Sequence, residues 1–173
     1  MKKHILIAAM ALGALAARAQ KLDKPRIDKI TGDTTLLTKE QTLANPFTIP
    51  GHYLAGNIMK GKDYYLLSFH LKDGMDIQYS VLSGDKAIVK FADGKLLELK
   101  AIGDTYSSLI SYANPAVAES FLSFDLTDSD VGELKNRKIA VIRINTSMGP
   151  FDYDIKDGKS EIIKKQLELI MKK

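Results

Sequence analysis

The chain has 173 residues, of which 45% are hydrophobic and 27% are charged, with 12 glycines and 5 prolines. This composition is typical of a folded domain and excludes collagen-like, low-complexity and broadly disordered chains. Cysteine is absent, which excludes a disulfide framework, a thiol nucleophile, cysteine-ligated zinc and an iron–sulfur cluster. The length predicts one domain, because domains usually hold about 100–200 residues.

The first 19 residues have the order of regions found in a secretory signal peptide. Lys2 and Lys3 form a basic start, residues 5–17 are an uncharged apolar run, and residues 17–19 form an Ala-Arg-Ala cleavage site. The run is shorter than the roughly 20 residues that span a bilayer. We therefore expect export to the periplasm or the medium, with cleavage after Ala19. Residues 20–173 are expected to form one domain without a transmembrane segment.

Removal of this segment changes the charge balance. The whole chain has 25 basic and 21 acidic residues, a net charge of +4. Residues 1–19 hold three basic residues and no acidic one, so the mature chain has 22 basic and 21 acidic residues. A net charge of +1 gives no electrostatic support for binding nucleic acid.

Alternation of apolar and polar residues between Gly–Asp turns predicts antiparallel strands in the first part of the mature chain. Residues 26–31 and 34–38 are expected to form a hairpin around Gly32-Asp33, and residues 43–51 a loop with two prolines. Further strands are expected, in order, over residues 52–59, 63–71, 76–81, 86–91 and 97–101, the last three as a meander.

The second part of the chain predicts two helices among further strands. Residues 105–116 look irregular, and residues 118–126 alternate as a strand. Thr127 and Asp130 form an acidic variant of the capping box before a short helix near 128–136. Residues 138–145 are apolar on both faces, which indicates a central strand. A last strand over 151–155 precedes an amphipathic helix over 160–173.

This order predicts an α+β domain, mainly an antiparallel sheet carrying the short helix and the C-terminal helix. The alternative is an up-and-down β-barrel with an external helix. Residues 62–154 resemble a group of small exported proteins of Gram-negative bacteria that have no assigned activity. The segments YYLLSFHL, GDKAIVKFADGKLLELK and FDLTDSDVGELKNRKIAVIRINTSMGPFDYDI carry the resemblance. It implies export and an α+β fold, and it transfers no functional residue.

Catalytic and metal-binding motifs are scarce. Asp152, Asp154 and Asp157 do not have the spacing of a calcium loop, and the first two fit the outward positions of a strand. The mature chain has two histidines, His52 and His70, without zinc-protease spacing, a nucleophile elbow or a phosphate-binding glycine motif. Either histidine could serve a serine such as Ser68 or Ser80, but ordinary strand histidines explain the pattern better. We expect no cofactor and no metal.

The function expected from these observations is that of an exported, non-catalytic binding or interaction protein. Its partner would be a protein, peptide or glycan, bound through residues 105–116 or 43–51. Tyr106 and Tyr112 are the candidate binding residues, because loop aromatics on a rigid sheet form sugar- or peptide-binding surfaces.

Two alternatives stay open. One is a small periplasmic hydrolase that uses dispersed carboxylates, which requires two acids with raised pKa values in one pocket. The other is a lipocalin-like carrier of a small apolar ligand, which requires a closed barrel with an unfilled interior.

Overall fold

The computed structural model describes residues 21–45, 52–110 and 116–172, and every structural statement below concerns these residues. They form antiparallel sheets with two α-helices, so the α+β class is confirmed. The elements are β1 (Arg26–Ile27), β2 (Thr34–Leu37), β3 (Gln41–Ala44), β4 (Tyr53–Lys60), β5 (Tyr65–Asp73), β6 (Ser80–Val81), β7 (Lys86–Phe91), β8 (Leu96–Lys100), β9 (Thr105–Tyr106), β10 (Ser108–Ile110), β11 (Val117–Leu126), α2 (Asp128–Asn136), β12 (Ile139–Thr146), β13 (Gly149–Asp154), the 3-10 turn η1 (Asp157–Lys159) and α3 (Ile162–Met171).

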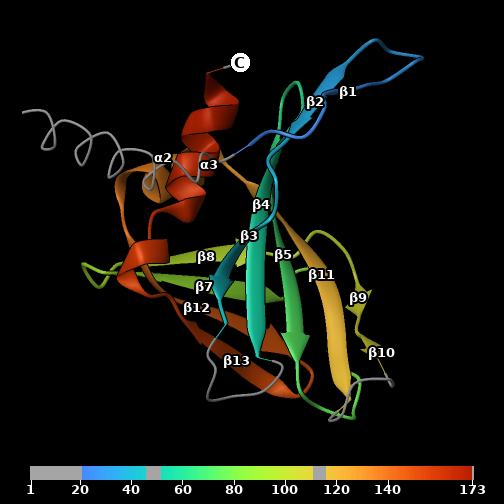
Figure 1. The fold of residues 1–173 in the computed structure, drawn as a ribbon, viewed down its shortest axis with the longest axis vertical. Helices are drawn as coiled ribbons and strands as arrows, with labels where there is room; N and C mark the ends of the chain where they lie inside the picture. Colours follow the sequence, from blue (N-terminus) through green and yellow to red (C-terminus); the bar gives the residue numbers. More distant parts are fainter. Residues whose placement is uncertain (1–20, 46–51, 111–115, 173) are drawn as a thin grey trace, which may run out of the picture.

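The strands belong to two main sheets. A seven-stranded sheet has the order β1-β2-β4-β5-β11-β10, with β3 also paired to β4, and a four-stranded sheet has the order β13-β12-β7-β8. The two sheets cross in space (Figure 1). On one side they are joined, because Ala101, directly after β8, pairs with Phe124 of β11. The result is a curled, half-barrel arrangement rather than a flat sheet.

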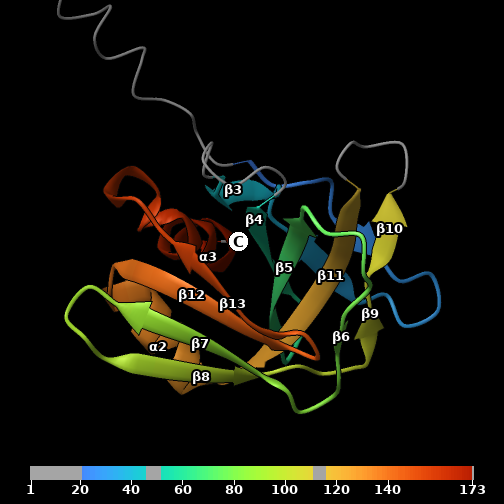
Figure 2. The ribbon, with the colours of Figure 1, turned by 90° about the horizontal axis from the view of Figure 1, so that it is seen from below.

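The opposite side of the half-barrel is filled by helix α3. It lies between β3–β4 and β12–β13 (Figure 2). Its residues Ile163, Leu167 and Ile170 are completely buried. The fold keeps the curled sheet of the barrel alternative, but α3 packs into the core instead of lying outside a closed wall. The helix is part of the core because the apolar face of a sheet is buried only when another layer packs against it.

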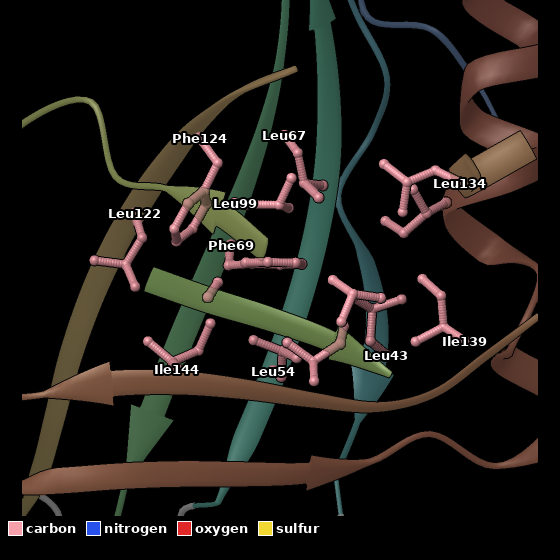
Figure 3. Packing of buried hydrophobic residues seen from close by; sticks show 14 of the residues in the cluster. Leu43, Leu54, Leu67, Phe69, Leu99, Leu122, Phe124, Leu134, Ile139 and Ile144 are labelled. Atoms are coloured by element: carbon pink, nitrogen blue, oxygen red, sulfur yellow. The ribbon is translucent and has the colours of Figure 1, made fainter. Parts of the chain in front are cut away.

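The interior is packed with large apolar side chains from both sheets and both helices (Figure 3). Alternation places Leu67, Phe69 and Leu71 of β5 on the inner face, each at most 1% exposed. Burying such a side chain contributes about 1.5–3 kcal/mol. The alternation in the sequence predicts this buried apolar face.

A glycine allows α3 to approach the sheet closely. A Cβ atom at Gly56 of β4 would lie 3.1 Å from Cδ1 of Leu43 and 3.3 Å from Cδ1 of Ile163. Gln166 of α3, which is fully buried, donates from Nε2 to the carbonyl of Gly56 at 2.9 Å and to that of Lys39 at 3.1 Å. The helix is thus held to β4 by packing and by hydrogen bonds.

The short helix starts where the sequence predicts. The hydroxyl oxygen of Thr127 accepts from the backbone N–H of Asp130, and the carboxylate of Asp130 accepts from the backbone N–H of Thr127 at 2.9 Å. This is the expected capping box of α2. The two reciprocal bonds satisfy donors that a helix start otherwise leaves unpaired.

We expect Thr127→Ala to lower the free energy of unfolding by about 1 kcal/mol, because the N-cap acceptor is lost. Urea denaturation measures the change. Ser129→Ala, an exposed substitution in the first turn of the same helix, is the control and should change stability by less than half as much. Equal effects of the two substitutions would contradict the capping role.

Several finer strand predictions need correction. The meander over 76–101 is broken, because β6 covers only Ser80–Val81 and pairs with β9, while Ile77 is 55% exposed. The irregular segment 105–116 contains β9 and β10, and Leu43 and Ala44 of the expected loop belong to β3. The pairing of β6 with β9 joins residues that are distant in sequence, and β3 and β10 are too short for a clear alternation.

Candidate functional site

The outer face of the seven-stranded sheet carries a cluster of polar and aromatic side chains. In the register, His70 of β5 lies opposite Ala55 of β4 and Phe121 of β11. Two residues further along β5, Lys72 lies opposite Tyr53 and Glu119. We call Tyr53, His70, Lys72, Glu119, Phe121 and the nearby Glu40 the outer-face cluster. The strand residues among them lie on the face turned away from the core, because the alternate residues of these strands are buried. Glu40, directly before β3, joins the cluster through its contact with His70.

His70 is the centre of this cluster. Its Nε2 lies 2.7 Å from Oε1 of Glu119, and its Nδ1 lies 3.1 Å from Oε1 of Glu40. Both partners are carboxylates, which only accept when ionised. Each contact forms when the ring nitrogen concerned carries a hydrogen. Ser68, on the same strand face, bonds instead to Ser123 at 3.1 Å, so the structure does not form a Ser68–His70 pair.

An aromatic row crosses the cluster. The ring of Phe121 stacks on that of His70 with centroids 4.2 Å apart, and Tyr53 meets His70 edge-on at 5.6 Å. Phe121 is nevertheless 62% exposed. The imidazole packs against the ring of Phe121, and the side chain otherwise projects to solvent from β11, next to the edge of the sheet. An exposed, supported aromatic ring is suited to contact a ligand.

Glu119 is a carboxylate in this arrangement. Its Oε1 also lies 2.9 Å from Nζ of Lys72. The hydrogen bond from Lys72 lowers the pKa of Glu119 below its ordinary value, and the bond from His70 acts in the same direction. A lowered pKa suits an acceptor and is opposite to what a general acid requires. Burial, the largest effect on Tyr53, raises the pKa of its hydroxyl.

A second polar cluster joins the two sheets. Nδ1 of His52 lies 2.5 Å from Oδ1 of Asp73, and the hydroxyl of Tyr153 donates to Oδ2 of the same carboxyl group at 2.7 Å. Nε2 of His52 lies 3.0 Å from the backbone carbonyl of Asp152. The rings of His52 and Tyr153 are stacked, 4.2 Å apart. We call His52, Asp73 and Tyr153 the inter-sheet network.

The inter-sheet network is arranged to hold the sheets together. Asp73 ends β5 of one sheet and Tyr153 belongs to β13 of the other, and both residues are buried. Burial raises the pKa of Asp73, as expected of a carboxyl acting in a catalytic site. However, both oxygens of Asp73 and both ring nitrogens of His52 are already bonded within the protein. The proton-accepting atoms of this pair are therefore engaged in internal hydrogen bonds and are not available to act on a substrate.

The two tyrosines singled out by the sequence have different outcomes. Tyr112 lies outside the described residues. Tyr106 is 68% exposed in β9, and the hydroxyl of its neighbour Thr105 donates to the carbonyl of Phe121 at 3.4 Å. Tyr106 therefore lies on a segment directly beside the outer-face cluster, and β9 and β11 are neighbours in Figure 2.

Sequence reasoning missed Phe121, although a signal was present. The same alternation that buries Leu122 and Phe124 in the core places Phe121 at an outward position. A large aromatic side chain at such a position has no core to fill. The contacts between His70, Glu40 and Glu119 could not be read from the sequence, because they join three separate strands or strand ends.

Asp152, one of the acidic residues considered for a calcium loop, has another partner. Both carboxylate oxygens of Asp152 accept from Arg143, each at 2.6 Å. In the described part of the chain, no three histidine or acidic side chains converge to hold a metal ion. An open cleft of about 470 Å³ lies where the β4–β5 turn meets the start of α2. Its lining mixes Lys60 and Lys62 with Asp63, Asp125 and Asp128, so it favours neither charge.

Comparison of the chain with family profiles, with curated proteins and with solved structures gave no match. Among the helices in the described residues, none has the length and apolar character needed to cross a membrane. The fold and the two clusters are therefore the observations from which function is argued.

Proposed function

We propose that this chain is an exported, non-catalytic binding protein that recognises its ligand through the outer-face cluster. The observation that carries the proposal is the position of Phe121, which is 62% exposed and stacked on His70. A ring that is already fixed loses little conformational freedom when a ligand binds. Its supporting histidine is fixed in turn by Glu40 and Glu119.

The hydrolase alternative has less support. It needs a carboxyl group with a raised pKa in an accessible cleft. Asp73 has a raised pKa, but it is buried and both its oxygens are bonded. Glu119 is accessible, but its pKa is lowered. The carrier alternative needs space between the sheets, where Leu54, Phe69 and Phe124 are packed instead.

The test uses the purified mature protein and three envelope fractions of the producing bacterium: cell-wall sacculi, polysaccharide, and detergent-extracted membrane proteins. We expect one fraction to retain the wild-type protein and to retain Phe121→Ser at least tenfold less. Leu96→Ser is the matched control, because Leu96 is 57% exposed on β8 of the other sheet. Equal retention of wild type and Phe121→Ser, or no retention by any fraction, would contradict the proposal.

A further inference from the structure

We infer that the outer-face cluster binds an uncharged saccharide, one ring of which stacks on Phe121. This inference rests on the proposed function and names the class of ligand. A pyranose ring has an apolar face of C–H groups and a rim of hydroxyl groups that both donate and accept. A matching site therefore needs an exposed aromatic ring with hydrogen-bonding groups at its border.

The border of Phe121 provides such groups. Glu119 lies two residues before Phe121 on the same strand face. Its Oε1 is bonded to His70 and Lys72. Its Oε2 makes no hydrogen bond to the described residues, so it is available to accept from a ligand hydroxyl. Lys72 supplies donors on the same side, because an ammonium group has three N–H bonds.

The other side of Phe121 has neutral polar groups. Ser123, two residues after Phe121 on β11, lies opposite Ser68 of β5, and their hydroxyl oxygens are 3.1 Å apart. Carboxylate, ammonium and hydroxyl groups thus border one aromatic ring.

The charge of the cluster favours an uncharged ligand. The carboxylate of Glu119 contacts Lys72, and Glu40 and Glu119 both contact His70. Groups of both signs therefore lie side by side at the border of Phe121, and neither a phosphate nor a cation meets a surface of one opposite charge. The carboxylates also oppose the phosphate contacts on which nucleic-acid affinity depends.

The backbone and the polar border disfavour two other ligands. An extended peptide adds to a sheet through an unpaired strand edge. At Phe121, however, β11 is paired with β5 on one side, and on the other side the carbonyls of Phe121 and Ser123 accept from Thr105 and Ile102. An apolar ligand would need a continuous apolar surface, whereas Phe121 is bordered by Glu119, Lys72 and Ser123. A saccharide uses the side chains of a sheet face and needs no free edge.

The experiment screens wild-type protein on an array of neutral bacterial and plant glycans and then titrates the best oligosaccharide by calorimetry. We expect Phe121→Ala to weaken binding about tenfold or more, because ring stacking is lost. Phe121→Tyr should keep most of the affinity, and Glu119→Gln should weaken it several-fold. Tyr106→Ala should weaken binding to longer oligosaccharides more than to short ones. Leu96→Ser should bind as the wild type does.

The outcomes separate this inference from the proposed function. If a membrane-protein fraction retains the protein through Phe121 and no glycan binds, the saccharide inference is overturned and the proposed function stands. If neither glycans nor envelope fractions bind, both are overturned. If a glycan binds equally well to wild type and Phe121→Ala, the stacking site is wrong.

Discussion

Replacing Asp73 with alanine is expected to lower the free energy of unfolding by about 3 kcal/mol, whereas Asp73→Asn should retain most of the stability at pH 8. The difference follows from the hydrogen bonds of the inter-sheet network. Alanine leaves the buried hydroxyl of Tyr153 and one nitrogen of His52 without their partner. Asparagine can replace both contacts without any charge.

The proton arrangement explains why asparagine fits. The backbone carbonyl of Asp152 can only accept, so Nε2 of His52 must carry a hydrogen. The contact between Nδ1 of His52 and Asp73 then contains one further proton, which either group can hold. In the asparagine variant, the side-chain amide donates to Nδ1 of neutral His52 and its oxygen accepts from Tyr153. Each polar atom again has a partner.

The pH dependence has a definite sign. Burial raises the pKa of Asp73 in the folded protein, so the folded state holds this proton more tightly than the unfolded chain. The stability due to this group is therefore fully present below the ordinary carboxyl pKa of about 3.9 and is lost as pH rises through the raised value. Asparagine does not titrate, so the stability of Asp73→Asn relative to wild type should increase with pH above about 4.

Urea denaturation between pH 4 and pH 8 measures both effects. Asp76→Asn is the matched control, since it makes the same chemical change three residues away at an exposed position. It should leave the pH profile of the wild type unchanged. The proposed proton arrangement is wrong if Asp73→Asn at pH 8 is as unstable as Asp73→Ala, or if its difference from wild type is constant across this range.

The sequence predicted the fold most accurately where local pattern and burial agree. β5 and β11 have the expected inner residues, and α2 begins at the expected cap. The errors fall on β3, β6, β9 and β10, which have two to four residues each. So few residues give no recognisable period, and their pairing depends on where longer strands place them.

The candidate site was predictable only in part. Tyr106 could be selected because aromatic residues of an irregular segment on a rigid sheet can form a binding surface, and it lies on a segment beside the cluster. The inter-sheet network joins residues 52, 73 and 153. No local spacing relates these positions, since they meet only when two sheets pack. Asp73 appears in the sequence as an ordinary turn acid next to Gly74, which gives no sign that it is buried.

Replacing Gln166 with glutamate is expected to destabilise the protein by about 4 kcal/mol at pH 7, because it places an uncompensated charge in the core. The Nε2 group of Gln166 donates to the carbonyls of Gly56 and Lys39. In the variant, a carboxylate oxygen would take its place and face two carbonyl oxygens. All three atoms only accept, so two bonds between α3 and the sheet would be replaced by repulsion. The residue is completely buried, so solvent cannot relieve this conflict.

Acid should partly restore the Gln166→Glu variant, since a protonated carboxyl group can donate to one of the two carbonyls. Its stability relative to wild type should therefore rise as pH falls from 7 toward the ordinary glutamate pKa of about 4.3 and level off below it, the reverse of the trend expected for a stabilising carboxylate. Gln78→Glu is the control, because Gln78 donates to one backbone carbonyl, that of Ser107 at 2.9 Å, from an exposed position. It should cost less than about 1 kcal/mol, since solvent hydrates the new charge. Similar losses at the two positions would show that α3 is not held by Gln166, and packing against Gly56 would then account for its attachment.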